Sequence, residues 1–321
     1  MKIYHGTDTF QPIPYAVVTS GTFDGVHLGH QKIISRLTEI AQRGDTRGQK
    51  GETVVLTFWP HPRTVVSNDS QGLKLLSTLE EKTELLEAAG VDHLVVIPFT
   101  RSFSELSSAE FIQQILVDQI GTKKLVIGYD HHFGRNREGS FEYLQQHAHE
   151  YGFEIEEIPR QDVEDVGVSS SKIRKALLEG DLETSTKFLG RPYSLSGTIV
   201  KGQQLGRTIG FPTANIQVDD PSKLVPANGI YATEVIYKGK TLGGAMSIGT
   251  RPTVGGTHRT LEVFIFDFNQ EIYGEHLTVR FIEYLRPELK YEGLAALVDQ
   301  MHLDVEQART ILQAGNKPGN A

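Results

Sequence analysis

Apolar residues in the first half of the chain form short runs that alternate with amphipathic stretches. The runs have the length of strands and occupy residues 15–19, 53–58, 93–98, 124–129 and 153–159. Between them, apolar side chains recur at helical spacing in residues 32–42, 77–90, 107–120 and 140–152. This alternation predicts an α/β fold, a parallel sheet covered by helices that binds ligands at the carboxyl ends of its strands.

The second half of the chain has a different pattern, in which Gly and Pro separate short β-like segments. These segments occupy residues 194–200, 229–237, 241–249, 261–268 and 276–285. They predict a small antiparallel β-barrel, followed by amphipathic helical segments within 293–312. The pattern changes within residues 180–193, so we expect one domain at 1–185 and another at 186–321.

Composition narrows the class of protein. The 321 residues include 38% hydrophobic residues, enough for about two globular domains. A net charge of -8 argues against binding to nucleic acid or to an anionic membrane surface. The absence of cysteine excludes disulfides and thiolate zinc sites, and residues 1–14 lack the apolar core of a signal peptide. No run approaches membrane-spanning length, and we therefore expect a cytoplasmic protein.

Two histidines stand where the first predicted strand turns into the first predicted helix. Residues 20–31 read SGTFDGVHLGHQ, with His27 and His30 one turn apart and Gly29 between them. A helix N-terminus offers unpaired N–H groups and a positive dipole end, which suit phosphate. Two imidazoles would add donors to the same anion, and Gly29 would leave the helix surface bare for a nucleotide.

Two plainer interpretations of this segment stay open. In one, the histidines cap and cover the start of a helix and have no further function. In the other they bind zinc, which would need a third ligand such as His61 and which usually takes histidines four residues apart. No acidic residue follows at the spacing of a metal ligand.

The segment GTFDGVHLGHQ resembles the His-x-Gly-His signature of nucleotidyltransferases, in the form found in bacterial bifunctional riboflavin kinase/FAD synthetases. Further matches to that family follow in order at residues 57–62, 128–134 and 168–174. The resemblance implies a Rossmann-like domain that transfers AMP from ATP to the phosphate of FMN. That phosphate is already anionic at pH 7, so the step needs alignment and charge stabilisation and no general base.

The resemblance also implies roles for single residues in this domain. His27, His30 and Arg174 would be catalytic. The nucleotide and its phosphates would contact a set of turn and helix-start residues: Gly21, Phe23, Asp24, Gly29, Ser169, Ser170 and Ser171. The serines fit physically as hydroxyls at a helix start, and Arg174 adds a forked cation one turn later. His61 and Asp130 would contact flavin or nucleotide. Orienting the turn is the alternative role for Asp24 and Asp130, and plain turn residues would look no different.

A Gly-rich loop in the second half carries another candidate site. Residues 202–216 read GQQLGRTIGFPTANI, which does not match the P-loop template. The Pro-Thr-Ala-Asn stretch resembles the signature of riboflavin kinases, as do residues 228–232, 249–253 and 285–297. The resemblance implies that Thr213 and Asn215 coordinate Mg²⁺, with Gly206 and Gly210 near phosphate. On a strand these two oxygen donors would share one face; a barrel turn capped by Thr and Asn is the alternative.

Glu262 is the candidate base of the second half. It lies in the otherwise apolar stretch TLEVFIFDF, where a carboxylate should be partly desolvated and therefore more basic. A kinase acting on riboflavin needs a base, because the 5′-hydroxyl must lose a proton as it attacks the γ-phosphate of ATP. The catalytic Glu of the family matches this position. A strand-end ion pair with Arg259 or Arg280 is the alternative interpretation.

The sequence thus predicts a bifunctional enzyme of flavin cofactor synthesis. It would use ATP and Mg²⁺ to convert riboflavin to FMN in the second half and FMN to FAD and diphosphate in the first, with flavoproteins as clients. Two alternatives are an adenylyltransferase for another phosphate ester and a flavin-sensing regulatory protein. Departures from the family pattern are Ser171 for Thr, His131 for an aromatic residue and Tyr291 for Phe. The sequence predicts no oligomeric state.

Overall fold

The computed structural model describes the chain except for residues 68–71, 129–130, 159–166, 203, 254–255 and 316–321. Its contacts divide the chain into two compact units, Met1–Ser170 and Ser171–Ala321. The sequence pattern put the domain boundary at 185/186, and the assignment of an activity to each side of that boundary stays a prediction. Each unit is described by itself below.

The first unit is built on a parallel sheet, as the sequence predicts. Its strands are β1 (Lys2–His5), β2 (Ala16–Ser20), β3 (Glu52–Trp59), β4 (His93–Pro98), β5 (Thr122–Gly128) and β6 (Glu154–Ile158). They pair in the order β1-β4-β3-β2-β5-β6, and every pair is parallel. Strand β1 is the one that the hydrophobic pattern does not reveal. It is a short edge strand with mostly exposed side chains, and edge strands need no continuous apolar run.

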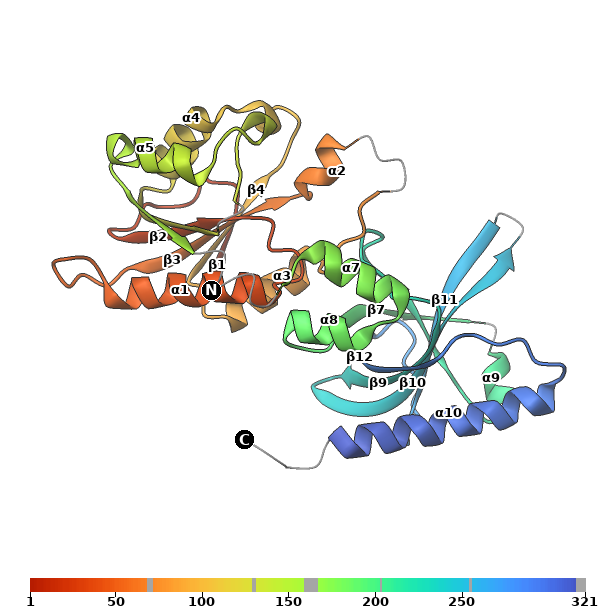
Figure 1. Ribbon diagram of the computed structural model, residues 1–321. Coiled ribbons are helices and arrows are strands. Elements are labelled where there is room, and N and C mark those ends of the chain that lie inside the picture. The colour runs from red at the N-terminus through yellow and green to blue at the C-terminus, as the bar shows by residue number, and fades with distance from the viewer. Residues whose placement is uncertain (68–71, 129–130, 159–166, 203, 254–255, 316–321) are drawn as a thin grey trace. The chain divides into compact units, whose positions relative to one another are not determined.

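Helices cover both faces of this sheet (Figure 1). They are α1 (Leu28–Arg43), α2 (Pro62–Val66), α3 (Leu79–Ala88), η1 (Phe103–Glu105), α4 (Ser108–Glu110), the π-helical η2 (Phe111–Gln119), η3 (Arg135–Arg137) and α5 (Phe141–Tyr151). One core packs α1 and α3 on one face through residues such as Leu37 and Leu86. A second core packs η2 and α5 on the other face, through residues such as Ile112 and Leu144.

The strand order places a topological switch point between β2 and β5. Strand β2 pairs with β3 on one side and with β5 on the other. In open parallel sheets, ligands bind outside the carboxyl ends of the two strands at which the order reverses. Both the turn that follows Ser20 and the segment that follows Gly128 start from this edge.

The second unit is a closed antiparallel barrel, as the sequence predicts. Its strands are β7 (Ser194–Val200), β8 (Ala214–Val218), β9 (Gly229–Tyr237), β10 (Lys240–Thr253), β11 (Gly256–Ile265) and β12 (His276–Arg286). They close in the order β10-β11-β8-β7-β12-β9. The helices are α7 (Ser170–Glu179), α8 (Leu182–Leu189), α9 (Leu205–Thr208) and α10 (Leu294–Gly315).

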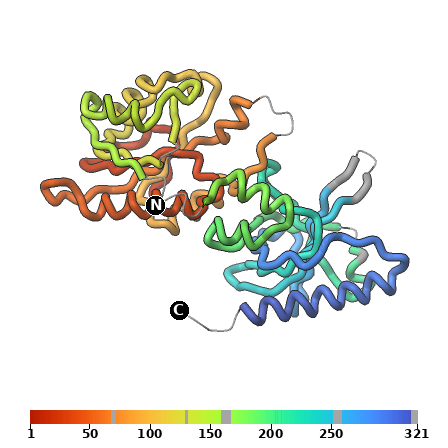
Figure 2. The backbone as a smooth tube through the Cα atoms, in the orientation of Figure 1, coloured from red at the N-terminus to blue at the C-terminus, as the bar shows by residue number. Residues whose placement is uncertain are grey.

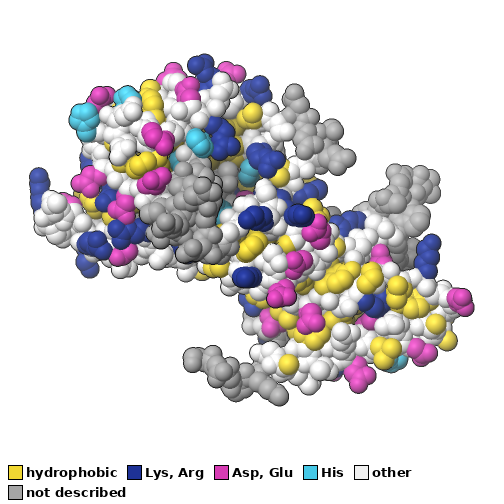
Figure 3. All heavy atoms as spheres, in the orientation of Figure 1, with side chains coloured by type: hydrophobic (Ala, Val, Ile, Leu, Met, Phe, Trp, Pro, Cys, Tyr) yellow, Lys and Arg dark blue, Asp and Glu magenta, His cyan; other side chains and the backbone are white. Residues whose placement is uncertain are grey.

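The terminal helix α10 lies along the outside of the barrel. Where the sequence predicts amphipathic segments, the structure has one helix of 22 residues. Figure 2 shows it as an unbroken blue helix beside the strands. Its buried Ala308 packs with Ala232 of β9 and with Phe266, which follows β11. On the face seen in Figure 3, hydrophobic side chains gather on this unit. Its exposed large apolar residues are Leu178, Leu289, Leu294 and Leu303.

Candidate active sites

The turn that follows β2 has an unusual backbone. Phe23, Gly25 and Val26 have positive φ angles of 46°, 79° and 40°. Residues other than glycine rarely adopt positive φ angles, so packing and hydrogen bonds around the turn must hold Phe23 and Val26 in this conformation. Phe23 is buried, and Gly21 N–H donates to the Leu56 carbonyl of β3 at 3.0 Å. The turn therefore brings the chain back sharply to start α1 at the switch point.

Asp24 holds this turn against the segment before α3. Its buried Oδ1 accepts hydrogen bonds from the backbone N–H groups of Leu76 at 2.9 Å and Ser77 at 3.2 Å. Gly25 N–H donates in turn to Ser77 Oγ at 3.0 Å. This carboxylate therefore orients the turn, one of the two roles that the sequence left open for it. Contact of Asp24 with the nucleotide stays a prediction.

His27 and His30 begin α1 together. His27 is the N-cap residue, and its Nδ1 accepts from His30 N–H at 3.4 Å. The two rings stack with their centroids 3.6 Å apart. Burial lowers the pKa of His30 well below its usual 6.5, and the nearby His27 and Lys82 lower it further. His30 Nδ1 is buried and has no hydrogen-bond partner in the described part of the chain. His30 is therefore neutral at pH 7 and keeps one ring nitrogen for a ligand.

The serine segment reaches the same turn from the end of the first unit. Ser170 Oγ donates to the Asp24 carbonyl at 3.1 Å. A Cβ at Gly29 would lie 3.2 Å from Val168 Cγ1 and 3.3 Å from His27 Cε1. Segments about 140 positions apart in the sequence thus meet at the start of α1. The neighbours of Gly29 are protein side chains, and the expected nucleotide contact there stays a prediction.

For the remaining predicted residues of this half other than Asp130, the structure gives a position on a helix or at its start. Ser169 precedes α7, and Ser171 and Arg174 lie on that helix, which continues into the second unit. His61 caps α2, with its Nδ1 accepting from Arg63 N–H at 3.1 Å. Asp130 lies outside the described residues. The phosphate and flavin contacts of all these residues stay predictions.

His131 and Ser20 form a polar pair at the switch point that the sequence did not suggest. Ser20 Oγ ends β2 and lies 3.2 Å from His131 Nε2, just beyond β5. Burial, helped by His132 and Arg137, lowers the pKa of His131 to about 4. A neutral imidazole thus joins the two strand ends, at a position where the family pattern has an aromatic residue.

In the barrel, strand pairing brings the second set of candidates together. Glu262 of β11 lies opposite Asn215 of β8 and opposite Ser247 of β10. Directly opposite residues of antiparallel strands point to the same face. Thr213 Oγ1 also donates to Glu262 Oε2 at 3.0 Å. Four polar side chains from three separate segments of the chain therefore share one face of the barrel.

The arginines that the sequence offered as ion-pair partners of Glu262 make other contacts. Arg280 Nη1 lies 3.6 Å from Glu234 Oε2. Arg259 donates to the backbone carbonyls of Val225 and Pro226. The described contacts thus favour a half-buried carboxylate hydrogen-bonded to Thr213 over a strand-end ion pair.

Glycines let the loop before β8 fold closely over this face. A Cβ at Gly206 would run into the carbonyl oxygen of Phe211, and one at Gly202 would run into the Asn215 amide. Phe211 N–H donates to the Gly206 carbonyl at 2.8 Å. Gly210 has a φ of 87°. Both predicted phosphate-loop glycines, Gly206 and Gly210, are thus required by the backbone, and their contact with phosphate stays a prediction.

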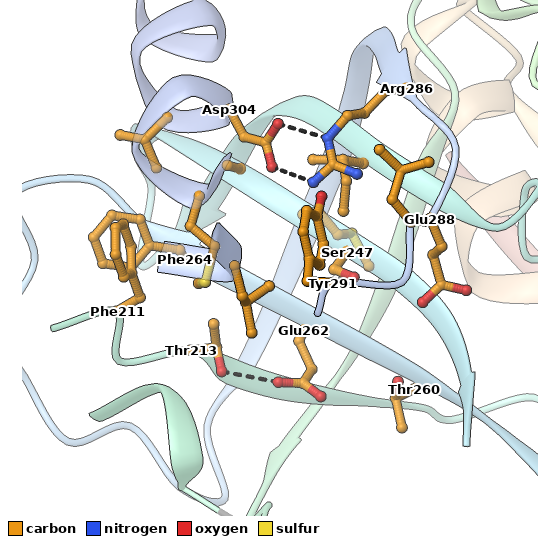
Figure 4. Close-up of a pocket in the computed structure, with 17 residues that line it drawn as sticks. Phe211, Thr213, Ser247, Thr260, Glu262, Phe264, Arg286, Glu288, Tyr291 and Asp304 are labelled. Atoms are coloured by element: carbon orange, nitrogen blue, oxygen red, sulfur yellow. Dashed lines mark hydrogen bonds and ion pairs between the residues drawn. The ribbon is translucent and has the colours of Figure 1, made fainter. Parts of the chain in front are cut away.

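A cavity of about 260 Å³ opens beside these residues (Figure 4). Thr213, Ser247, Thr260 and Glu262 line one part of it, and apolar side chains line much of the remainder: Phe211, Ile230, Met246, Phe264, Leu297, Met301 and Val305. The cavity is thus mostly apolar, with oxygen donors grouped at one place, as in small-molecule sites.

A buried ion pair lines the opposite side of this cavity. Arg286 of β12 donates to both carboxylate oxygens of Asp304 on α10, at 2.7 and 2.6 Å. The Tyr291 ring lies near this guanidinium, and its buried hydroxyl has no hydrogen-bond partner among the described residues. The pair ties α10 to the barrel, and Tyr291 leaves one donor unused inside the cavity wall.

The described residues contain no group of three or more His, Cys, Asp or Glu side chains placed to hold a metal ion by themselves. At the barrel face, however, Thr213, Asn215 and Glu262 present hydroxyl, amide and carboxylate oxygens side by side. Oxygen donors of this kind suit Mg²⁺, which is usually held by few protein groups together with the phosphates of a substrate.

Fold and sites together define a phosphate-transferring enzyme with two centres, one at the edge of a parallel sheet and one in a barrel with a carboxylate. Comparison with known proteins agrees. The sequence profile of FAD synthetase matches residues 11–172, and that of riboflavin kinase matches residues 189–312. The chain belongs to the bifunctional riboflavin kinase/FMN adenylyltransferase family. The family and fold expected from the sequence are thereby confirmed, and so are the two enzyme activities.

Curated relatives cover nearly the whole chain. A bifunctional riboflavin kinase/FMN adenylyltransferase of Listeria monocytogenes is 41% identical over 295 residues, which cover 91% of each chain. The protein of the same name from Escherichia coli K12 is 36% identical over 312 residues, covering 96% of this chain and 97% of the relative. Both halves of the molecule are therefore represented in these relatives, in the same order.

A solved structure has the same fold. It is described as a macrolide-efflux protein from Streptococcus pneumoniae and is 31% identical. It superposes with a TM-score of 0.85 over 96% of this chain and 98% of its own. In the parts of the present chain that the structure describes, no helix combines the length and the apolar character needed to cross a membrane.

Proposed function

We propose that the barrel phosphorylates riboflavin to FMN and that the first unit adenylylates FMN to FAD, each with ATP. The observation that carries the proposal is the grouping of Thr213, Asn215 and Glu262 on one face of the barrel, where Thr213 and Glu262 line a mostly apolar cavity. A nucleotidyltransferase alone would not need this second centre. The presence of the second centre therefore disfavours the alternative of an enzyme that adenylylates some other phosphate ester.

In the kinase step, Glu262 would serve as the general base. The 5′-hydroxyl oxygen of riboflavin forms a bond to the γ-phosphorus of ATP, the bond from that phosphorus to the β-γ bridging oxygen breaks, and ADP leaves. The hydroxyl proton passes to the Glu262 carboxylate. The Thr213 hydroxyl supports this role because its hydrogen bond of 3.0 Å fixes the direction of the carboxylate.

Thr213 and Asn215 would hold Mg²⁺ through their side-chain oxygens, and Glu262 lies next to both. When bound, the ion neutralises charge on the phosphates of ATP. Neutral protein ligands leave most of the coordination to phosphate oxygens, which fits an ion that arrives with its nucleotide. The loop with Gly206 and Gly210 would then lie along those phosphates.

The flavin ring would occupy the apolar part of the cavity. Phe211, Phe264 and Met301 line it and suit a large, flat, mostly apolar ring. The polar edge of the ring needs partners, and the Tyr291 hydroxyl is a donor with none of its own. We therefore assign Tyr291 to the flavin, although a Phe at this position would fill the same space.

In the adenylyl-transfer step, no base is needed. A phosphate oxygen of FMN forms a bond to the α-phosphorus of ATP, and the bond from that phosphorus to the bridging oxygen of diphosphate breaks. His27, His30 and the N–H groups at the start of α1 would stabilise the charge that moves onto diphosphate. The residues at the start of α7 would bind the phosphates of ATP: Ser169, Ser170, Ser171 and Arg174. The buried Nδ1 of His30, which has no hydrogen-bond partner among the described residues, supports a role as hydrogen-bond donor.

The test is to incubate purified chain with riboflavin, ATP and Mg²⁺ and to separate the flavins by chromatography. We expect FMN and then FAD. Glu262→Gln should lose FMN formation but still convert supplied FMN to FAD, and His27→Ala should do the reverse. Each variant thus controls for the folding of the other. Absence of both products from the wild-type chain would refute the proposal, and loss of both from one substitution would indicate a single shared site.

A further inference from the structure

Lys82 is a buried cation for which neither proposed reaction step has a use. It lies on α3 and is only 2% exposed. Lysine is almost never buried to this degree unless a carboxylate pairs with it. Its ammonium donates to Thr57 Oγ1 at 3.4 Å and lies 5.4 Å from the centre of the Trp59 ring. No carboxylate forms an ion pair with it in the part of the chain that the structure describes.

The position of Lys82 connects it to the turn after β2. Thr57 Oγ1, which accepts from the ammonium, itself donates to the Thr22 carbonyl at 3.3 Å. One hydroxyl group thus separates the ammonium from the backbone of the turn. The segment just before α3 also binds that turn, through Ser77 and the Asp24 carboxylate. Lys82 therefore lies directly beneath the turn that starts α1.

The charge of Lys82 is felt by the groups that face it. From the turn, Asp24 favours the charged ammonium, whereas burial opposes it more strongly and lowers the pKa of Lys82 to about 8. From α1, His30 is kept from protonation partly by Lys82. From β3, Thr57 and Trp59 face the ammonium, and on α3 itself the Glu81 carboxylate accepts from the Thr78 N–H of the N-cap. Burial of the Lys82 ammonium is thus unfavourable to its charged form.

A structural role alone does not explain why a lysine without an ion-pair partner among the described residues is buried at this position. Replacement of an unpaired buried charge by an apolar side chain of similar size is often neutral or stabilising. A buried cation is useful where an anion is to be attracted, because a low dielectric strengthens its field. The Thr57 hydroxyl joins Lys82 to the turn that leads from β2 to α1, beside the switch point of the sheet.

We propose that Lys82 is a positioning residue of the adenylyl-transfer site, whose buried ammonium places positive charge beneath the turn and so favours a nucleoside triphosphate bound over it. The proposal rests on the proposed function only for the identity of the reaction. Lys82 itself touches no substrate; it acts through Thr57, the turn and the adjacent histidines.

Binding of a polyphosphate should pull a proton onto Lys82. In the free protein about half of the ammonium is charged near pH 8, and a nearby anion raises that fraction. The affinity for ATP should therefore fall as the pH rises above 8, and binding at pH 8.5 should take up part of a proton. The phosphate groups of the ligand do not contribute to this proton uptake at pH 8.5, because their last pKa lies near 6.

The first experiment needs no variant. Calorimetry of full-length protein with a non-hydrolysable ATP analogue at pH 8.5, in two buffers of different ionisation enthalpy, measures the proton uptake. The same titration of Glu262→Gln is the control for the barrel, because proton uptake that depends on Lys82 must persist in that variant. Proton uptake in both proteins supports the proposal, and its absence overturns it.

The second experiment compares Lys82→Met with Lys82→Arg. We expect the Met variant to raise the KM for ATP in FAD synthesis about tenfold or more, with riboflavin kinase activity unchanged. Its pH profile above 8 should be flat, and Arg should restore affinity and extend it to higher pH. Lys124→Met is the matched control, because Lys124 lies in the same unit and pairs with Glu154 and Glu156 at the far sheet edge.

The outcomes separate this proposal from the proposed function. If the wild-type chain binds the analogue with proton uptake but makes no FAD, the reaction is wrong and the role of Lys82 stands. If it makes FAD while Lys82→Met, folded by its circular dichroism, keeps the wild-type KM and pH profile, the role of Lys82 is wrong. If Met prevents folding, the proton uptake of the wild-type chain and the pH profile of Lys82→Arg decide.

Discussion

The imidazole rings of His27 and His30 stack at an interplanar angle of 15°, with 3.6 Å between their centroids. Two charged imidazoles would repel strongly at this distance, and burial together with this repulsion keeps the pKa of His30 below its usual value. The stack also keeps both rings at the start of α1, where N–H groups face outward. This arrangement is suited to donating hydrogen bonds to phosphate and is sensitive to acid.

The stability of the first unit should therefore fall in acid. Because the pKa of His30 is lowered in the folded protein, the unfolded chain takes up a proton first as the pH falls below 6.5. The stability is thus complete above pH 6.5 and is lost progressively below it, by at most about 1.4 kcal/mol per pH unit for this group. His30→Gln should flatten that dependence, and the exposed His149→Gln should not. Fluorescence of Trp59, the one tryptophan, reports urea unfolding of this unit; equal slopes in all three proteins would contradict the prediction.

Gly206→Ala should disable the kinase selectively. The new methyl group would collide with the Phe211 carbonyl oxygen and displace the loop that carries Thr213. Misplacement of catalytic groups by about 1 Å can cost about a hundredfold in rate, so we expect at least a tenfold loss of FMN formation. Gly293→Ala is the matched control, because no atom lies within 4 Å of its Cβ position. Assay of both activities checks the result, since FAD synthesis from FMN should survive in each variant.

Asp304→Asn should destabilise the barrel. The substitution leaves the Arg286 guanidinium without its carboxylate, and the two side chains are only 17% and 7% exposed. Removing one partner of a buried pair costs about 3–5 kcal/mol. Asp267→Asn, which breaks the exposed pair with Arg309, should cost much less. Urea unfolding followed by circular dichroism compares the two, and equal shifts would mean that Arg286 and Asp304 are not effectively buried.

Tyr291→Phe should weaken riboflavin binding without harming the fold. The change removes a buried hydroxyl that has no partner in the described part of the chain, so the ligand-free barrel should keep or gain stability. If the hydroxyl donates to the flavin, the KM for riboflavin should rise by about three- to tenfold. The control is Tyr273→Phe, whose hydroxyl accepts from Gln204 outside the cavity. An unchanged KM would remove Tyr291 from the flavin site.

Much of the fold follows from local pattern. Strands β7 and β9 occupy the very residues that the alternation predicts, because barrel strands bury every second side chain. Strand β1 and the short β8 were not recognised as strands, because neither has a long apolar run. Lys82 escaped notice for a related reason. On an amphipathic helix a lysine is normally a solvent-facing residue, and only the packing of α3 against β3 buries this one.

The sequence by itself determined the two fold types, the order of the motifs and the residue types at each centre, because these depend on spacing and local chemistry. The tertiary structure decided which distant residues meet: Ser170 with Asp24, Ser20 with His131, and Thr213 with Glu262. It also decided that the Lys82 ammonium lies beneath the turn after β2. Such contacts depend on strand order and register, and no local pattern in a single chain specifies which strand pairs with which.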